Sequence, residues 1–210
     1  MDKEDELKDR ARKAMRNIID NIESMSLESF IKTCAEMGLD GVELTAYYFK
    51  DTSIKYLQEV KKNAFKYGMH IAGTAVGNNF CQADEKVRKE QIQMVKDWID
   101  HSVILGSPCI RVFAGYVPEG YTEKDAFNWT VECVKECVEY GEKNGVVIAL
   151  ENHGGITGTA DQVIKLMGEI KSDWLGLNLD FGNFRYPWIE FEKVAKYAVT
   201  THSKTHYFEG

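Results

Sequence analysis

The sequence predicts an α/β fold in which about six parallel strands alternate with helices. Two observations support this. The run Val146–Leu150 is apolar throughout and has no helical period, which is typical of a strand buried on both faces of a parallel sheet. Similar short apolar runs recur along the chain, separated by segments with apolar residues at three- and four-residue steps. Strands that alternate with helices in this way favour a parallel sheet with right-handed crossovers.

The expected elements follow in order along the chain. Helices are expected at residues 27–37, 54–67, 82 or 84–105, 123–144, 159–170 and 189–196. Strands are expected at residues 40–45, 70–76, 109–114, 146–151, 175–180 and 198–204. Four of the helices stop at a glycine, the residue favoured just after a helix: Gly38, Gly68, Gly106 and Gly145.

Residues 1–24 are expected to form an extra amphipathic helix. Their apolar residues lie on one stripe: Leu7, Ala11, Ala14, Ile18 and Ile22. Residues 25–210 then form one domain of (β/α) repeats. A complete TIM barrel needs eight strands, so the six expected here predict a TIM-barrel-like but incomplete arrangement.

Composition excludes several classes of protein. The chain has 210 residues, of which 44% are hydrophobic and 28% charged, and these values suit one globular domain. A net charge of −7 argues against a nucleic-acid partner. No apolar run is long enough for a membrane span, and five cysteines without a CxxC pair fit reduced thiols. We therefore expect a cytoplasmic protein with no membrane partner.

Polar residues stand where three successive strands are expected to end. Glu151, Asp180 and His202 each follow an apolar run, and Lys204 lies on the same face as His202. The carboxyl ends of parallel strands form the active face of such barrels. Two carboxylates with one imidazole suit Mn, Mg or Co, or a catalytic Zn with open positions. We expect these three residues to converge on one divalent metal ion.

Five motifs, in this order, resemble the sugar phosphate isomerase/epimerase family of xylose isomerase-like TIM barrels. They are Asp40-Gly-Val-Glu-Leu, Gly73-Thr-Ala-Val-Gly-Asn-Asn-Phe, Ile110-Arg-Val-Phe-Ala-Gly, Ala149-Leu-Glu-Asn-His-Gly-Gly and Asn178-Leu-Asp-Phe-Gly-Asn. The resemblance covers roughly residues 25–204 and implies a barrel from which the first and eighth strands are missing.

The resemblance also implies a chemistry. Glu151, Asp180 and His202 match three metal ligands, and Glu151 matches a catalytic acid/base that takes a proton α to a sugar carbonyl, through an enediolate. The family's fourth ligand is a glutamate on the eighth strand, and its loss predicts weak activity for this chain. Asn183 occupies a position where many members have a substrate-binding histidine.

Several other residues have two interpretations. His153 is a substrate contact or a loop histidine, and Asn78 is a candidate sugar contact. Arg111 binds an anionic substrate or pairs with a carboxylate inside the barrel. Lys204 binds a substrate oxygen or a neighbouring carboxylate. Two further possibilities are Glu43 pairing with Arg111 or reaching the barrel mouth, and His206 replacing His202 as the ligand.

The leading hypothesis is an isomerase or epimerase of a small sugar or keto-sugar. A keto-sugar lyase would use the same metal centre, and a truncated or engineered barrel fragment without catalysis is the non-enzyme alternative. The two outer strands expose unpaired backbone groups, so a homodimer through the open side of the barrel is expected.

Overall fold

The computed structural model describes residues 25–184 and 186–204. Six parallel strands form one sheet in the order β1-β2-β3-β4-β5-β6. The strands are β1 (Gly41–Thr45), β2 (His70–Ala75), β3 (Cys109–Val112), β4 (Val147–Glu151), β5 (Leu175–Asp180) and β6 (Ala198–His202). The predicted incomplete TIM-barrel-like fold is confirmed.

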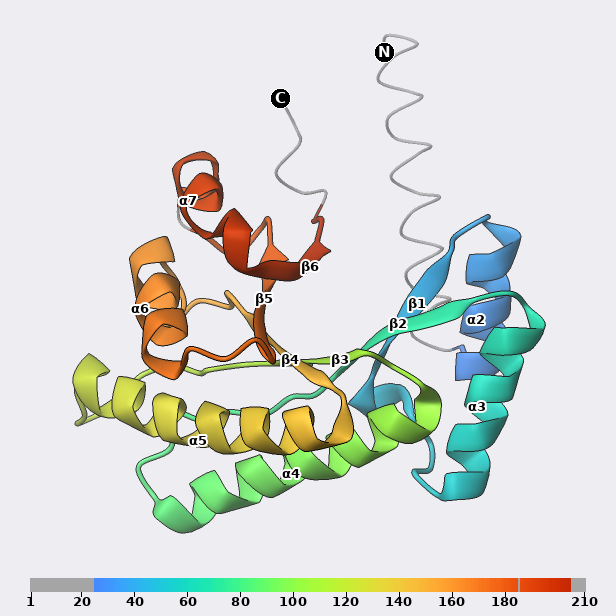
Figure 1. The fold of residues 1–210 in the computed structure, drawn as a ribbon, viewed down its shortest axis with the longest axis horizontal. Helices are drawn as coiled ribbons and strands as arrows, with labels where there is room; N and C mark the ends of the chain where they lie inside the picture. Colours follow the sequence, from blue (N-terminus) through green and yellow to red (C-terminus); the bar gives the residue numbers. More distant parts are fainter. Residues whose placement is uncertain (1–24, 185, 205–210) are drawn as a thin grey trace, which may run out of the picture.

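One helix precedes β1, the other described helices connect successive strands, and together they cover the outer side of the curled sheet (Figure 1). They are α2 (Leu27–Glu36), α3 (Ile54–Lys66), α4 (Glu85–Leu105), α5 (Glu123–Asn144), α6 (Ala160–Ile170) and α7 (Pro187–Val194). Short 3-10 turns add η1 (Ala46–Tyr48) and η2 (Ala195–Tyr197). Helix caps fix several boundaries: Thr122 and Thr159 each form a capping box at the start of α5 and α6.

Two expected elements at the C-terminal side have different bounds from those predicted. The strand expected at residues 198–204 ends at His202, because its last pairing is between Asp180 and His202. The helix expected at residues 189–196 begins earlier, at Pro187, and gives way to a 3-10 turn after Val194. Lys204 therefore lies beyond β6 rather than within it.

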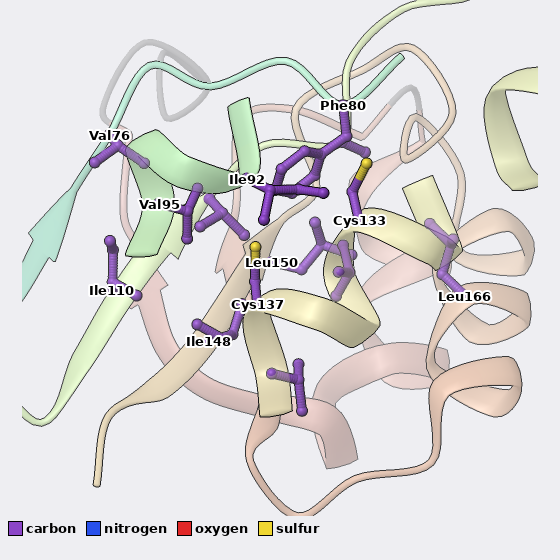
Figure 2. Close-up of a cluster of buried hydrophobic side chains, with 14 of the residues drawn as sticks. Val76, Phe80, Ile92, Val95, Ile110, Cys133, Cys137, Ile148, Leu150 and Leu166 are labelled. Carbon is purple, nitrogen blue, oxygen red and sulfur yellow. The ribbon is translucent and has the colours of Figure 1, made fainter. Parts of the chain in front are cut away.

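The main core lies between the sheet and helices α4 and α5. Figure 2 shows Cys133 and Cys137 of α5 in one cluster with Phe80, Ile148 and Leu150. All five are fully buried or nearly so. Burial raises the pKa of the Cys133 thiol to about 12, with a smaller contribution from nearby acidic groups. These cysteines behave as small core residues, and all five cysteines of the chain are free.

The outer strands β1 and β6 each pair with a single neighbour among the described residues. The sheet curls so that these two edges approach one another, and Glu43 of β1 contacts His202 of β6. The predicted helix at residues 1–24, with its stripe through Leu7, Ile18 and Ile22, lies outside the described residues. His206 lies outside them too.

Among the described helices, none combines the length and the hydrophobicity that a membrane span requires.

Candidate active site

Asp180 is held at the end of β5 by the side chain of Asn152 and the backbone amide of Gly182. Asn152, fully buried at the end of β4, donates to the Asp180 carbonyl at 3.0 Å and accepts from the Asp180 amide at 2.7 Å. The Gly182 amide donates to Oδ1 of Asp180 at 2.7 Å. Oδ2 is buried and receives no hydrogen bond in the described structure. Oδ1 is thus fixed by the backbone, and Oδ2 is left to pair with a cation, which in this structure is the Lys204 ammonium at 2.7 Å.

Glu151 ends β4 with a carboxylate that is surrounded by donors. Its Oε1 lies 3.0 Å from Nδ1 of His153 and accepts from the amide of Asn183 at 3.0 Å. Its Oε2 lies 3.1 Å from Nε of Arg111 and 3.4 Å from the amide nitrogen of Asn178. The Glu151 side chain is only 4% exposed, and Arg111, whose side chain is 8% exposed, compensates its charge. Arg111 is therefore the barrel-interior ion-pair partner rather than a partner of Glu43.

An aromatic ring orders the groups around Glu151. The guanidinium carbon of Arg111 lies 4.0 Å from the centroid of the Phe113 ring, and that ring lies 4.3 Å from the His153 ring at 38°. Arg111 also donates to the Val76 carbonyl at 2.8 Å. The His153 side chain remains 44% exposed. The stack fixes Arg111 within the barrel and leaves His153 at its open face.

His202 lies between three carboxylates. Its Nδ1 is 3.9 Å from Oε2 of Glu151 and 3.9 Å from Oδ2 of Asp180, while Nε2 is 3.2 Å from Glu43. The hydrogen bond with Glu43 is the largest cause that raises the pKa of His202 above its ordinary value, and burial opposes it. The charges of the three carboxylates raise it further. Glu151, Asp180 and His202 lie close together in the structure, as the sequence predicts.

Lys204 reaches back over the site from beyond β6. Its ammonium lies 2.7 Å from Oδ2 of Asp180 and donates to Oδ1 of Asn183 at 2.9 Å. Of the two partners expected for Lys204, the structure shows the carboxylate. Asn183 thereby joins Lys204 to Glu151, since its amide nitrogen binds the glutamate.

Asn78 is the one candidate whose polar groups are used by the backbone. It is 2% exposed, donates to the Phe113 carbonyl at 2.8 Å and accepts from the Phe113 amide at 3.0 Å. This pair of bonds holds the end of β3 and so supports Phe113. The structure gives Asn78 the role of a loop anchor, and its sugar contact stays a prediction.

The donor set fits a divalent cation. Ligand atoms of Glu151, Asp180 and His202 all lie within 4.8 Å of one another. Oδ2 of Asp180 and Oδ1 of Asn178 are buried without a hydrogen bond. The Lys204 ammonium is the nearest positive group to Oδ2 of Asp180. Two carboxylates and one imidazole match the preferences of Mn, Mg, Co or Zn.

A scan against family models matches residues 31–208 to a family described as xylose isomerase-like TIM barrel. The chain belongs to this family. The predicted resemblance is confirmed, and the described site lies at the strand ends where enzymes with this barrel carry their chemistry.

The chain matches part of one longer curated protein. An uncharacterised protein of Methanocaldococcus jannaschii is 28% identical over 169 residues, which are 75% of this chain and 57% of that protein. The chain thus spans little more than half the length of this curated relative.

Two solved structures illustrate the fold. D-psicose 3-epimerase of Clostridium cellulolyticum, solved with D-tagatose, is similar with a TM-score of 0.75 and 19% identity over 85% of this chain and 67% of that one. A xylose isomerase-like TIM barrel protein of Mycobacterium smegmatis, in complex with magnesium, is similar with a TM-score of 0.67 and 18% identity. The match covers 84% of this chain and 65% of that one. At these identities the likeness establishes the fold.

Sequence reasoning missed two supports of the site, Phe113 and Asn152. Phe113 lies two residues beyond Arg111, so strand alternation places both on one face and was the available signal. Asn152 follows Glu151, and its side chain is hydrogen-bonded to the Asp180 backbone of β5. No sequence pattern predicts this link between β4 and β5.

Proposed function

We propose that this chain carries a sugar isomerase or epimerase centre that acts on a small sugar or keto-sugar by metal-assisted proton transfer. The observation that carries the proposal is the cluster of Glu151, Asp180 and His202 at neighbouring strand ends, with Glu151 buried and fixed by Arg111. Membership of the xylose isomerase-like family supports it.

A bound divalent ion, Mn, Mg, Co or Zn, would act as a Lewis acid on the sugar carbonyl. Glu151 then serves as the general base: one carboxylate oxygen takes the proton from the carbon next to the carbonyl. The C–H electron pair forms a carbon–carbon double bond, and the π pair of the carbonyl moves onto its oxygen, which gives an enediolate. In an isomerisation the proton returns to the former carbonyl carbon and the hydroxyl proton passes to the other oxygen. In an epimerisation a second acid must deliver a proton to the original carbon from the opposite face.

The open face of the site offers groups for the substrate hydroxyls. His153 is partly exposed beside Glu151, and Asn183 and Lys204 form a chain of donors and acceptors over Asp180. We assign these three side chains to substrate binding. Arg111 acts indirectly in this proposal, by compensating the charge of Glu151.

Metal binding is the direct test of this proposal. Isothermal titration with Mn²⁺ is expected to show one site, and the three described ligands predict weaker binding than a four-ligand site gives. Asp180→Asn and His202→Ala should each weaken binding by about 100-fold or more, beyond the 10- to 100-fold typical of residues that only support a ligand. The matched control is Glu90→Gln, on an exposed face of α4. Unchanged binding in both ligand variants would contradict the proposal, and a native chain that binds no Mn²⁺ would favour the inert-fragment alternative.

We also infer a homodimer through the open side. The edges β1 and β6 each lack a second strand among the described residues, and large apolar side chains of α7 and β6 are exposed, with Trp188 73% and Val199 56% exposed. Light scattering at micromolar concentration should give twice the chain mass. The monomer mass would exclude this dimer. The cytoplasmic location stays a prediction.

A further inference from the structure

Glu43 approaches His202 from the opposite edge of the sheet. Glu43 lies on β1 and His202 on β6, yet both carboxylate oxygens of Glu43 lie 3.2 Å from Nε2 of His202. The contact joins residues far apart in the sequence and spans the side of the barrel where the sheet is open. The proposed proton-transfer chemistry leaves Glu43 without a role.

The neighbours of His202 fix which ring nitrogen carries the proton. An ionised carboxylate only accepts hydrogen bonds, so Nε2, 3.2 Å from both oxygens of Glu43, must carry a hydrogen. The amide nitrogen of Asn178 lies 3.0 Å from Nδ1 and 3.4 Å from Nε2, so it does not distinguish the two ring nitrogens. The hydrogen on Nε2 faces Glu43. The lone pair of Nδ1 then lies on the same side as Glu151 and Asp180.

The backbone around Glu43 accommodates its carboxylate in this position. The pairing of β1 with β2 shifts between Val42 and Glu43, so that Glu43 pairs with Gly73. Irregularities of this kind re-aim a side chain and are frequent beside active sites. A Cβ placed on Gly73 would lie 3.3 Å from Oε2 of Glu43. Glycine at this position leaves the room that the carboxylate uses.

We propose that Glu43 is a positioning residue that holds His202 in the tautomer and orientation needed to bind a metal ion through Nδ1. The inference rests on the metal site of the proposed function. Histidines that bind metals regularly donate their other ring N–H to a carboxylate, which fixes the ring and increases its strength as a ligand. Here the carboxylate comes from the far edge of the incomplete barrel.

The contact is suited to orientation rather than to stability. The Glu43 and His202 side chains are 26% and 30% exposed, and ion pairs with such access to water contribute little to folding. Removing the Glu43 carboxylate should therefore leave the unfolding temperature nearly unchanged while it weakens metal binding.

Mn²⁺ titration of the full chain tests the proposal. Glu43→Ala is expected to weaken binding by about 10- to 100-fold. Glu43→Gln should stay within about 3-fold of the native affinity, because the glutamine oxygen still accepts the bond from Nε2. The Glu90→Gln control should bind as the native chain does. Native Mn²⁺ affinity in Glu43→Ala would overturn the proposal. An equal loss of affinity in Glu43→Gln and Glu43→Ala would also overturn it, because it would make the Glu43 carboxylate a direct metal ligand.

A metal-free measurement separates failure of this inference from failure of the proposed function. Nitrogen-15 NMR of the imidazole of His202, at alkaline pH where the ring is neutral, should show the hydrogen on Nε2 in the native chain and in Glu43→Gln. Glu43→Ala should shift the ring toward a mixture of tautomers. If the native chain binds no Mn²⁺, the proposed function fails, while this signature still tests Glu43. A native ring with its hydrogen on Nδ1 overturns the inference alone.

Discussion

A Glu151→Gln variant is expected to exchange the α-proton of a ketose roughly 1,000-fold more slowly than the native chain, within the range that a positioned general base contributes. Glutamine preserves the size of the side chain but cannot take up the proton. It also replaces a charged ligand in the cluster with Asp180 and His202. The measurement is the rate of deuterium incorporation from heavy water, followed by proton NMR.

The Glu90→Gln variant controls for the loss of one negative charge, since Glu90 is exposed on α4. It should exchange at the native rate. A Glu151→Gln rate within about 10-fold of native, well short of the full contribution of a general base, would show that another group takes the proton.

The second large effect is expected on stability. Arg111→Met should lower the free energy of unfolding by about 3–5 kcal/mol, because it leaves the buried Glu151 carboxylate without its cation. The melting temperature of a chain of this size should fall by roughly 2–4 °C for each kcal/mol. The change also removes the Arg111 bond to the Val76 carbonyl and its contact with Phe113.

A double variant separates the charge from the packing. Arg111→Met combined with Glu151→Leu removes both charges, and replacing a buried pair by apolar groups is often neutral or stabilising. The double variant should therefore be more stable than Arg111→Met alone in chemical denaturation. If the free energy of unfolding of Arg111→Met lies within about 1 kcal/mol of the native value, the range of exposed ion pairs, Arg111 does not compensate Glu151.

Much of the fold followed from local patterns. Apolar runs and helix-stop glycines predicted the six strands and the described helices to within a few residues, because these signals depend on near neighbours in the chain. The position of Glu151 and Asp180 at strand ends also followed, since parallel strands place their carboxyl ends together. The early end of β6 did not follow, because it depends on where the pairing with β5 stops.

The partners within the site were less accessible to prediction. Glu43 was expected either to pair with Arg111 or to reach the barrel mouth. It reaches His202 at the end of β6, while Arg111 pairs with Glu151. The sequence shows that these charges lie on strands, but the choice of partner depends on how far the sheet curls. That curl brings β1 to β6 and is a property of the whole packed sheet.

Isotope exchange shows whether Glu151 moves a proton of a ketose when the chain is loaded with metal. The native chain would be incubated in heavy water with D-psicose or D-tagatose, with Mn²⁺ in one sample and EDTA in another. Deuterium is expected at C3, next to the carbonyl, in the Mn²⁺ sample and not in the EDTA sample; loss of water from the sugar after exchange would instead identify a lyase. No incorporation in a sample shown by titration to contain bound Mn²⁺ would contradict proton transfer by Glu151.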